Sequence, residues 1–327
     1  MKERLHNLTV IIPVFNEEES IPLLHERLSR VMKEQNLSYE IIYVDDGSSD
    51  GTFSQLQTVT MQDQQVQVIR LRRNFGQTAA LAAGVDHSTG ELLVFMDGDL
   101  QNDPVDIPRL LAKLDEGYDV VSGWRKHRQD GELNRKLPSR LANQLISRVT
   151  GVHLHDYGCT LKCYRWEVFQ HLHLYGEMHR FLPAYAALAG AKVAELEVTH
   201  HARRFGVSKY GISRTIRVLL DLITLKFLGS FGTKPMYAFG IPGLCAFVLG
   251  MIAFLASLGQ RNSPQRARSN PLAPLLHFSG FGIQCIMLGI LAEVLMRTYH
   301  ESQGKATYTV KNSLPFHRSR PGKHEAA

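Results

Sequence analysis

Apolar residues occur in two spacing patterns in the first half of the chain. Short runs rich in Val, Ile and Leu predict strands, and segments where apolar residues recur every three or four positions predict helices. Asn16 is the candidate cap of the first helix, and Pro104 suits the first turn of the last. Repeated strand–helix units predict an α/β domain with a mostly parallel sheet and helices on both faces. The expected strands are 8–14, 40–44, 66–71, 91–96 and a fifth beginning at 119–122, and the expected helices are 17–34, 77–87 and 104–116.

The last third of the chain has a different pattern. Residues 203–230 mix apolar and basic positions at helical spacing, which predicts interfacial helices or, alternatively, a core-facing helix. Residues 236–258 then run without a charge, and residues 275–296 carry only Glu293. Each stretch can span a bilayer at about 1.5 Å per residue, so we expect a transmembrane hairpin rather than two buried helices.

Composition and charge narrow the class of protein. The 327 residues are 44% apolar and 21% charged, with a formal net charge of +6. Basic clusters lack interleaved aromatic residues, which argues against nucleic acid and favours an anionic membrane surface or a phosphate-bearing substrate. The cysteine spacing fits no metal or redox pair and indicates a reducing compartment. The polar N-terminus and the basic residues flanking the spans predict a cytoplasmic first domain.

Acidic residues stand where the fourth strand is expected to end. Asp97 and Asp99 follow the apolar run 92–96, and alternate residues of an extended chain point the same way, so both carboxylates can share one hard cation. Gly98 would let phosphates approach the backbone, and Gln101 would add a neutral oxygen ligand. The alternative is an acidic turn without a ligand.

A second acidic pair, Asp45 and Asp46, follows the second strand. A carboxylate there can accept hydrogen bonds from ribose hydroxyls or a base N–H, and the alternative is capping of the next helix by Ser49 or Asp50. Because ligands of parallel sheets bind at the carboxyl ends of strands, the acidic clusters should form one site. No GxGxxG or Walker A sequence is present, which argues against dinucleotide-binding oxidoreductases and P-loop NTPases.

Two basic segments are candidates for binding phosphates. The first follows the fifth strand and contains Arg125, Arg135 and Ser139; arginine forks suit a phosphate, and a solvated basic face is the alternative. The second contains Arg203 and Lys209 among glycine and serine residues. It suits a loop that closes over phosphates, and the alternative is a basic linker.

These motifs together resemble glycosyltransferase family 2, whose catalytic domain has the GT-A fold. Within it the chain is most similar to the polyprenyl-phosphate glycosyltransferases, such as dolichol-phosphate mannose synthase and the undecaprenyl-phosphate glucosyl and formamido-arabinosyl transferases. The resemblance covers nearly the whole chain. The matching segments are 12–17, 44–50, 73–77, 97–104, 156–159 and 203–210.

The resemblance implies transfer of a sugar from a nucleotide-diphosphate sugar, with a UDP-sugar favoured, to a polyprenyl phosphate such as undecaprenyl phosphate. It implies a single displacement with inversion that uses Mg²⁺ or Mn²⁺. Asp156 would orient the acceptor or act as a base, and orientation is favoured. The implied nucleotide-sugar residues are Pro13, Phe15, Glu17, Asp45, Asp46, Arg203 and Lys209; the metal ligands are Asp97, Asp99 and Gln101; the acceptor-phosphate residues are Arg125, Arg135 and Ser139; and the catalytic group is Asp97, Asp99, Asp156 and Arg125.

The resemblance also implies a setting. We expect a multi-pass protein of a bacterial inner membrane that acts at the lipid bilayer, with no nucleic-acid partner and with a homo-oligomer, a tetramer in the family, as one possibility. The expected parts are a cytoplasmic GT-A domain at 1–205, interfacial helices at 206–234, a hairpin at 235–298 and a cytoplasmic tail at 299–327. The alternatives are a processive polysaccharide synthase and a non-catalytic sugar-nucleotide sensor.

Overall fold

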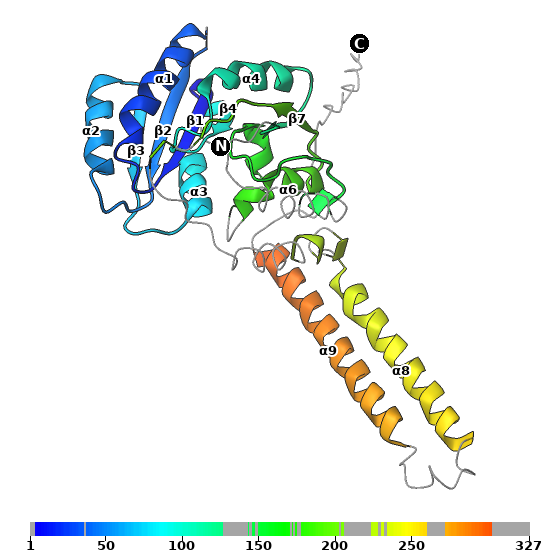
Figure 1. Ribbon diagram of the computed structural model, residues 1–327. Coiled ribbons are helices and arrows are strands. Elements are labelled where there is room, and N and C mark those ends of the chain that lie inside the picture. The colour runs from blue at the N-terminus through cyan, green and yellow to red at the C-terminus, as the bar shows by residue number, and fades with distance from the viewer. Residues whose placement is uncertain are drawn as a thin grey trace, which may run out of the picture.

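Figure 1 shows the computed structural model, which describes residues 4–35, 37–126, 143, 146–147, 150–170, 172, 174, 178–202, 204–205, 224–227, 230–231, 234–259 and 272–302. Its strands are β1 (His6–Val14), β2 (Tyr39–Asp45), β3 (Val66–Arg70), β4 (Gly90–Phe95), β5 (Val120–Trp124), β6 (Lys162–Arg165) and β7 (Val193–Glu197). Its helices are α1 (Ser20–Glu34), α2 (Thr52–Gln62), α3 (Gln77–His87), η1 (Pro104–Asp106), α4 (Ile107–Asp115), η2 (Trp166–Gln170), η3 (Met178–Arg180), α6 (Leu182–Leu188), α8 (Pro235–Gly259) and α9 (Leu272–Ser302).

The strands form one mixed, mostly parallel sheet in the order β3-β2-β1-β4-β6-β5-β7. Neighbours from β3 to β4 are parallel, β6 is antiparallel to both β4 and β5, and β7 is parallel to β5. Because β6 opposes both of its neighbours, β5 runs in the same direction as β4. The carboxyl ends of β1, β2, β4 and β5 therefore lie at one edge of the sheet.

Side chains alternate along the strands between two cores, as expected for a sheet covered on both faces. On β1, Val10 and Ile12 lie in the core that α1, α2 and α4 cover, whereas Ile11 between them lies in the core that α3 and α6 cover. Figure 1 shows these two helix layers on opposite sides of the sheet. The α/β arrangement predicted from the alternating pattern is confirmed.

The first helix begins later than the pattern predicts, at Ser20 instead of residue 17, and Asn16 is not its cap. The backbone of Asn16 is left-handed, with φ of 55°, which is not the extended conformation of an N-cap. Its side-chain oxygen instead accepts a hydrogen bond from the Ser49 amide at 2.9 Å. The prediction failed because Asn16 joins the end of β1 to the turn after β2.

The two C-terminal helices pack against each other as a hairpin that extends from the α3 and α6 side of the domain (Figure 1). By length and composition both could cross a membrane, with mean hydropathies of 2.3 and 1.8. Gly243 and Gly282 allow the close approach, since a Cβ on either would lie 2.9 Å from the carbonyl oxygen of the other. Large apolar side chains cover the outer surface of both helices, which suits a lipid environment.

Helical segment 224–227 connects this hairpin to the domain. Leu225 is 1% exposed and belongs to a small core with Phe181 and Ala184. Phe227 contacts Phe239 of α8, with ring centroids 5.9 Å apart. These contacts place the start of the first long helix directly beneath the domain. Within the predicted amphipathic stretch 203–230, residues 203, 206–223 and 228–229 lie outside the described residues.

Candidate active site

Polar residues emerge at the sheet edge where four strands end. Asp45 is the last residue of β2, Asp97 follows β4 by two positions, and Arg125 directly follows β5. The backbone links the first two strands here, because the Asp46 amide donates to the Val14 carbonyl oxygen at 2.9 Å. The parallel direction of these strands brings together side chains that are far apart in the sequence.

The acid pair lies in a tight turn after β4. The side-chain Nε2 of Gln77 donates to Asp97 Oδ1 at 2.7 Å, so the first residue of α3 orients this carboxylate. Asp99 is 9% exposed, and its Oδ1 accepts a hydrogen bond from the Gln101 amide N–H at 3.2 Å. A Cβ on Gly98 would lie 2.7 Å from Val14 Cγ1, so the glycine also lets the turn pack against β1.

The donor atoms at this turn suit a hard divalent cation. Two carboxylates and one amide oxygen are the ligands that Mg²⁺ and Mn²⁺ accept, and such ions usually take their remaining ligands from phosphates and water. Among the described residues, no group of three or more His, Cys, Asp and Glu side chains is close enough to hold a metal. Two carboxylates and one amide oxygen fall short of the four protein ligands of a closed structural metal site.

The carboxylate of Asp45 is fully buried at the end of β2. Its Oδ1 accepts a hydrogen bond from the Ser48 amide at 2.9 Å. Its Oδ2 lies 3.4 Å from Arg70 Nε without forming a hydrogen bond. A buried oxygen with this unused capacity can accept a hydrogen bond from a ligand.

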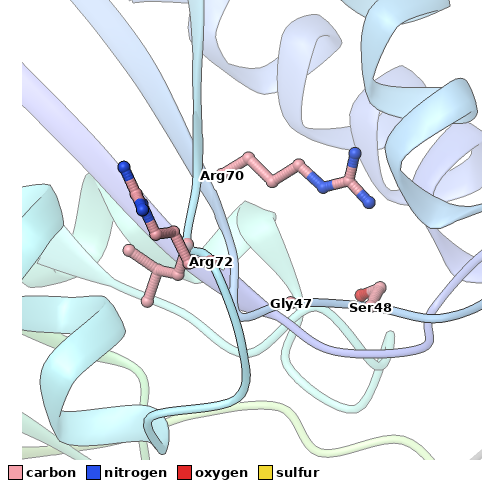
Figure 2. A pocket seen from close by; sticks show the side chains of 5 residues that line it. Gly47, Ser48, Arg70 and Arg72 are labelled. Carbon is pink, nitrogen blue, oxygen red and sulfur yellow. The ribbon is translucent and has the colours of Figure 1, made fainter.

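A pocket of about 510 Å³ is lined by Gly47, Ser48, Arg70, Leu71 and Arg72, so the arginine that pairs with Asp45 forms part of its wall. Figure 2 shows the two arginine side chains extending in different directions above the Gly47–Ser48 backbone. The Arg70 guanidinium also lies over the Phe53 ring, 4.2 Å from its centroid. The pocket thus offers cationic and backbone groups to a ligand at the β2–β3 side of the edge.

The neighbouring carboxylate, Asp46, holds a loop. Its two oxygens accept hydrogen bonds from the Phe75 and Gly76 amides at 2.7 and 2.9 Å. Burial raises the pKa of Asp46, and these two amide hydrogen bonds oppose the rise. Asp46 therefore fixes the segment that leads into α3 and to Gln77.

The predicted residues after β1 lie at the same edge. Pro13 and Phe15 are half-buried there. The Glu17 amide donates to Thr52 Oγ1 at 2.8 Å, and the Glu17 carboxylate accepts a hydrogen bond from Ser20 Oγ at 2.8 Å. These contacts fasten the β1 end to the start of α2.

Arg125 is held by a bidentate pair with Asp156. Its Nε and Nη2 donate to the two carboxylate oxygens at 2.7 and 3.1 Å. Burial alone would lower the pKa of Arg125, and the charge of Asp156 outweighs it, so the pKa is raised and the guanidinium stays charged. The carboxylate of Asp97 also contributes to this rise, which indicates that the acid turn and Arg125 are near each other.

Sequence reasoning gave no role to several polar residues at the edge. Gln77 is the last residue of motif 73–77, and its contact with Asp97 depends on the tertiary fold. His201 pairs with Asp103 at 2.8 Å and so ties residues 200–202 to the segment after the acid turn. Lys162 and Glu195 come from strands that the pattern did not predict. The candidate residues Arg135, Ser139, Arg203 and Lys209 lie outside the described residues.

Comparison with solved structures identifies the architecture. The fold is similar to glucosyl-3-phosphoglycerate synthase of Mycobacterium tuberculosis, solved with Mn²⁺, UDP and phosphoglyceric acid, with a TM-score of 0.53 and 18% identity. The similarity covers 68% of this chain and 78% of that one. The domain therefore has the GT-A fold.

Sequence comparison identifies the family. Residues 9–172 match the profile of glycosyl transferase family 2. The chain is 43% identical to dodecaprenyl-phosphate galacturonate synthase of Rhizobium johnstonii, covering 93% of this chain and 92% of that protein. It is 37% identical to undecaprenyl-phosphate 4-deoxy-4-formamido-L-arabinose transferase of an Enterobacter species, covering 94% of each. The chain belongs to glycosyl transferase family 2 and is an enzyme of the glycosyltransferase class.

Proposed function

We propose that this protein transfers a sugar from a UDP-sugar to a polyprenyl phosphate such as undecaprenyl phosphate, with inversion at the anomeric carbon. One observation carries the proposal: a pair of acids after β4 and a carboxylate-locked arginine after β5 meet at one edge of the sheet. An acid pair suits the cation of a nucleotide diphosphate, and a rigid arginine suits the phosphate that attacks it. The names of the two relatives support a prenyl-phosphate acceptor.

The acids and Gln101 are the proposed ligands of Mg²⁺ or Mn²⁺. The bound ion would neutralise the charge that develops on the departing nucleoside diphosphate. The chain's own contribution is to hold the ligands still: Gln77 orients Asp97, and the Gln101 amide orients Asp99. Mn²⁺ and UDP in the M. tuberculosis enzyme of the same fold are consistent with this assignment.

The donor nucleotide would lie between the ends of β1 and β2. Asp45 would accept a hydrogen bond from the base or ribose, and Pro13, Phe15, Glu17 and Asp46 would shape the surrounding wall. The pocket beside Arg70 is the place we propose for the base or ribose. Arg203 and Lys209 are proposed to cover the diphosphate.

The acceptor is proposed to bind at Arg125, with help from Arg135 and Ser139. The second pKa of a phosphate monoester is about 6, so its attacking oxygen is ionised at neutral pH. The acceptor therefore needs to be positioned more than it needs to be deprotonated. Asp156 binds Arg125 through both oxygens, which favours an orienting role over that of a base.

The helical hairpin is consistent with an acceptor that is a membrane lipid. A polyprenyl chain stays in the bilayer, so its phosphate is reached at the membrane surface. We propose that α8 and α9 span a bacterial inner membrane, with domain 1–205, the helices at 206–234 and tail 299–327 on the cytoplasmic side, and with the hairpin at 235–298. A homo-oligomer is compatible with this arrangement.

A processive polysaccharide synthase is less favoured. Such enzymes carry a Gln-x-x-Arg-Trp motif, and the nearest sequence here, Lys162 to Trp166, lies on and after β6. Arg165 donates to the carbonyl oxygens of Leu114 and Tyr118, and Arg4 stacks on Trp166 at 3.5 Å from the ring centroid. These contacts give both residues structural partners away from the sheet edge that carries the acids.

The test uses the full-length protein in lipid nanodiscs with undecaprenyl phosphate, Mn²⁺ or Mg²⁺, and radiolabelled UDP-sugars that include UDP-galacturonate, UDP-glucose and the formamido-arabinose donor. We expect label from one donor to move into the lipid fraction. Asp97→Asn should lower the rate by about 100- to 1,000-fold, whereas Asp115→Asn, on the exposed end of α4, should leave it unchanged.

Three results would contradict parts of the proposal. Label in a polymer would indicate a synthase, and donor binding without transfer would indicate a sensor. Full activity after chelation of divalent ions would refute the metal assignment.

A further inference from the structure

Two charged residues beneath the sheet edge have no part in the mechanism proposed above. Lys162 opens β6 and is 3% exposed, and Glu195 lies in the middle of β7 with 11% of its side chain exposed. An ionised group in a protein interior is costly unless it is paired and hydrogen-bonded. Their contacts therefore need an explanation.

The sheet register sets these residues on either side of β5. Ser122 of β5 is opposite Lys162 of β6 and opposite Glu195 of β7. Residues opposite each other across neighbouring strands present their side chains on the same face. Ser122 lies three positions before Arg125, so the two charges flank the strand that delivers the candidate acceptor arginine.

Both side chains bind one turn, residues 155–159, that covers this face of β5. Lys162 Nζ donates to the carbonyl oxygens of Tyr157, at 3.3 Å, and Cys159. Glu195 accepts hydrogen bonds from the amides of His155 and Asp156, at 2.9 and 3.0 Å. The lysine thus holds the carbonyl groups of the turn, and the glutamate holds its amide groups.

The turn carries Asp156, the partner of Arg125. The turn and its contacts bring together four charged side chains whose net charge is zero: Lys162, Arg125, Asp156 and Glu195. Because opposite charges offset one another, burying the four together costs less free energy than burying any one of them alone. A Cβ on Gly158 would lie 3.1 Å from Arg125 Nη2, so the turn passes directly over the guanidinium. Movement of the turn would move Asp156 and release the arginine.

We propose that Lys162 and Glu195 are positioning residues that clamp turn 155–159 and so hold Arg125 in the orientation that receives the acceptor phosphate. The role of Arg125 in this statement rests on the function proposed above, whereas the clamp rests on the contacts themselves. Neither residue touches a substrate in this arrangement.

The turn has a built-in spectroscopic reporter. His155 stacks on Trp124, the last residue of β5, with ring centroids 4.3 Å apart and planes at 19°. Trp124 and Trp166 are the two tryptophans of the chain. In a Trp166→Phe background, the emission of Trp124 therefore reports whether the turn remains in place.

The experiment places Lys162→Met and Glu195→Gln in that background, each with a matched control on or next to the same strand. Tyr164→Phe is the control on β6, since Tyr164 is fully buried and its hydroxyl has no hydrogen-bond partner. Lys192→Gln is the control for β7, since the exposed Lys192 directly precedes this strand at the end far from Trp124. Circular dichroism confirms folding, and Glu195→Gln, at the less buried position, serves if Lys162→Met does not fold.

We expect both clamp variants to change Trp124 emission and both controls to leave it unchanged. Because loss of supporting contacts around a site typically costs about 10- to 100-fold, kcat/KM for the polyprenyl phosphate should fall by that factor while the KM for the nucleotide sugar stays the same. Unchanged Trp124 emission in the clamp variants would show that Lys162 and Glu195 do not hold turn 155–159. Changed emission with unchanged acceptor kinetics would show that the clamp does not position Arg125. Absence of lipid transfer by the parent protein would refute the proposed function, and the emission would still decide whether the clamp exists.

Discussion

Asp45 and Asp46 are adjacent in the sequence, yet their carboxylates have different surroundings. Asp46 uses both oxygens on the Phe75 and Gly76 amides, so it supports the loop before α3. Asp45 uses one oxygen on the Ser48 amide and keeps the other buried beside Arg70 without a hydrogen bond. The difference arises because strand residues alternate between faces, and it makes Asp45 the better candidate for contact with the donor.

Asp45→Asn tests this difference. The amide oxygen can keep the hydrogen bond from Ser48, but the NH₂ group can no longer accept one from a base or ribose. We expect the KM for the nucleotide sugar to rise by about 10- to 100-fold, the cost of an unmatched hydrogen bond to a charged group, while the KM for polyprenyl phosphate is unchanged. Steady-state kinetics with each substrate varied measures both. Asp63→Asn, at the distant end of α2, is the control, and equal changes in both KM values would contradict the assignment.

At the scale of elements, the sequence predicts the strands that are continuous apolar runs and misses those that are not. β1, β2, β3 and β4 are found within one or two residues. β1, β2 and β4 are mostly buried on both faces and need apolar side chains, whereas β3 is a partly buried edge strand that is recognised by its β-branched residues Val66, Val68 and Ile69. β6 is not predicted, because it begins with a lysine and is four residues long. β7 is missed for a related reason, since its sequence, VAELE, carries Glu195 and Glu197.

The candidate site likewise contains residues that the sequence predicts and residues that it misses. Asp97, Asp99 and Asp45 are predicted as site candidates from the sequence because a carboxylate at the end of an apolar strand must reach a polar environment. Gln77 and Glu195 act through contacts with residues at least 20 positions away, and Lys162 acts by binding carbonyl oxygens of the turn that precedes its own strand. Local pattern carries no information about such contacts, so the supporting residues of the site require the fold.

The close packing of α8 on α9 leads to a prediction about the hairpin. Gly243→Leu should separate the helices, because a Cβ there already meets the Gly282 carbonyl oxygen. Overpacking costs about 1–3 kcal/mol, so the melting temperature of the detergent-solubilised protein should fall by several degrees. Gly280→Leu on the same hairpin is the matched control, since no atom lies within 4 Å of its Cβ position. Equal losses in both variants would show that the Gly243–Gly282 contact is not what holds the helices.

The helix layer of α1 and α2 should make stability depend on pH. His25 lies 3.5 Å from Asp63, and burial lowers its pKa, an effect that Asp63 opposes and Lys33 reinforces. In the unfolded chain His25 takes up a proton at about pH 6.5, whereas in the folded chain it takes up the proton only at lower pH. The free energy of unfolding therefore falls as the pH drops below about 6.5. We expect His25→Gln to flatten the decline in melting temperature between about pH 6.5 and 5. The exposed His87→Gln should leave the decline as it is, and an unchanged slope in His25→Gln would contradict the prediction.

At the scale of the molecule, the domain lies above the hairpin, where it could bind both the donor and the acceptor of the proposed reaction. In that proposal the soluble donor would reach the sheet edge from water, whereas the prenyl acceptor would stay in the lipid. Leu225 is buried in the domain, and Phe227 contacts α8, so a short segment fixes the domain close to the start of the first span. A domain held in this way can meet a phosphate at headgroup height without releasing the lipid.

The orientation of the whole molecule in the membrane gives the last prediction. Basic residues on the domain side of the spans favour a cytoplasmic domain. In a Cys245→Ser background, Met61→Cys reports on the domain, since Met61 on α2 is 86% exposed, and Leu258→Cys reports on the far end of α8. A membrane-impermeant maleimide should label Met61→Cys in inverted vesicles and Leu258→Cys in spheroplasts. Labelling of Met61→Cys in intact spheroplasts would put the domain outside the cell, away from cytoplasmic nucleotide sugars, and would contradict both the topology and the proposed donor.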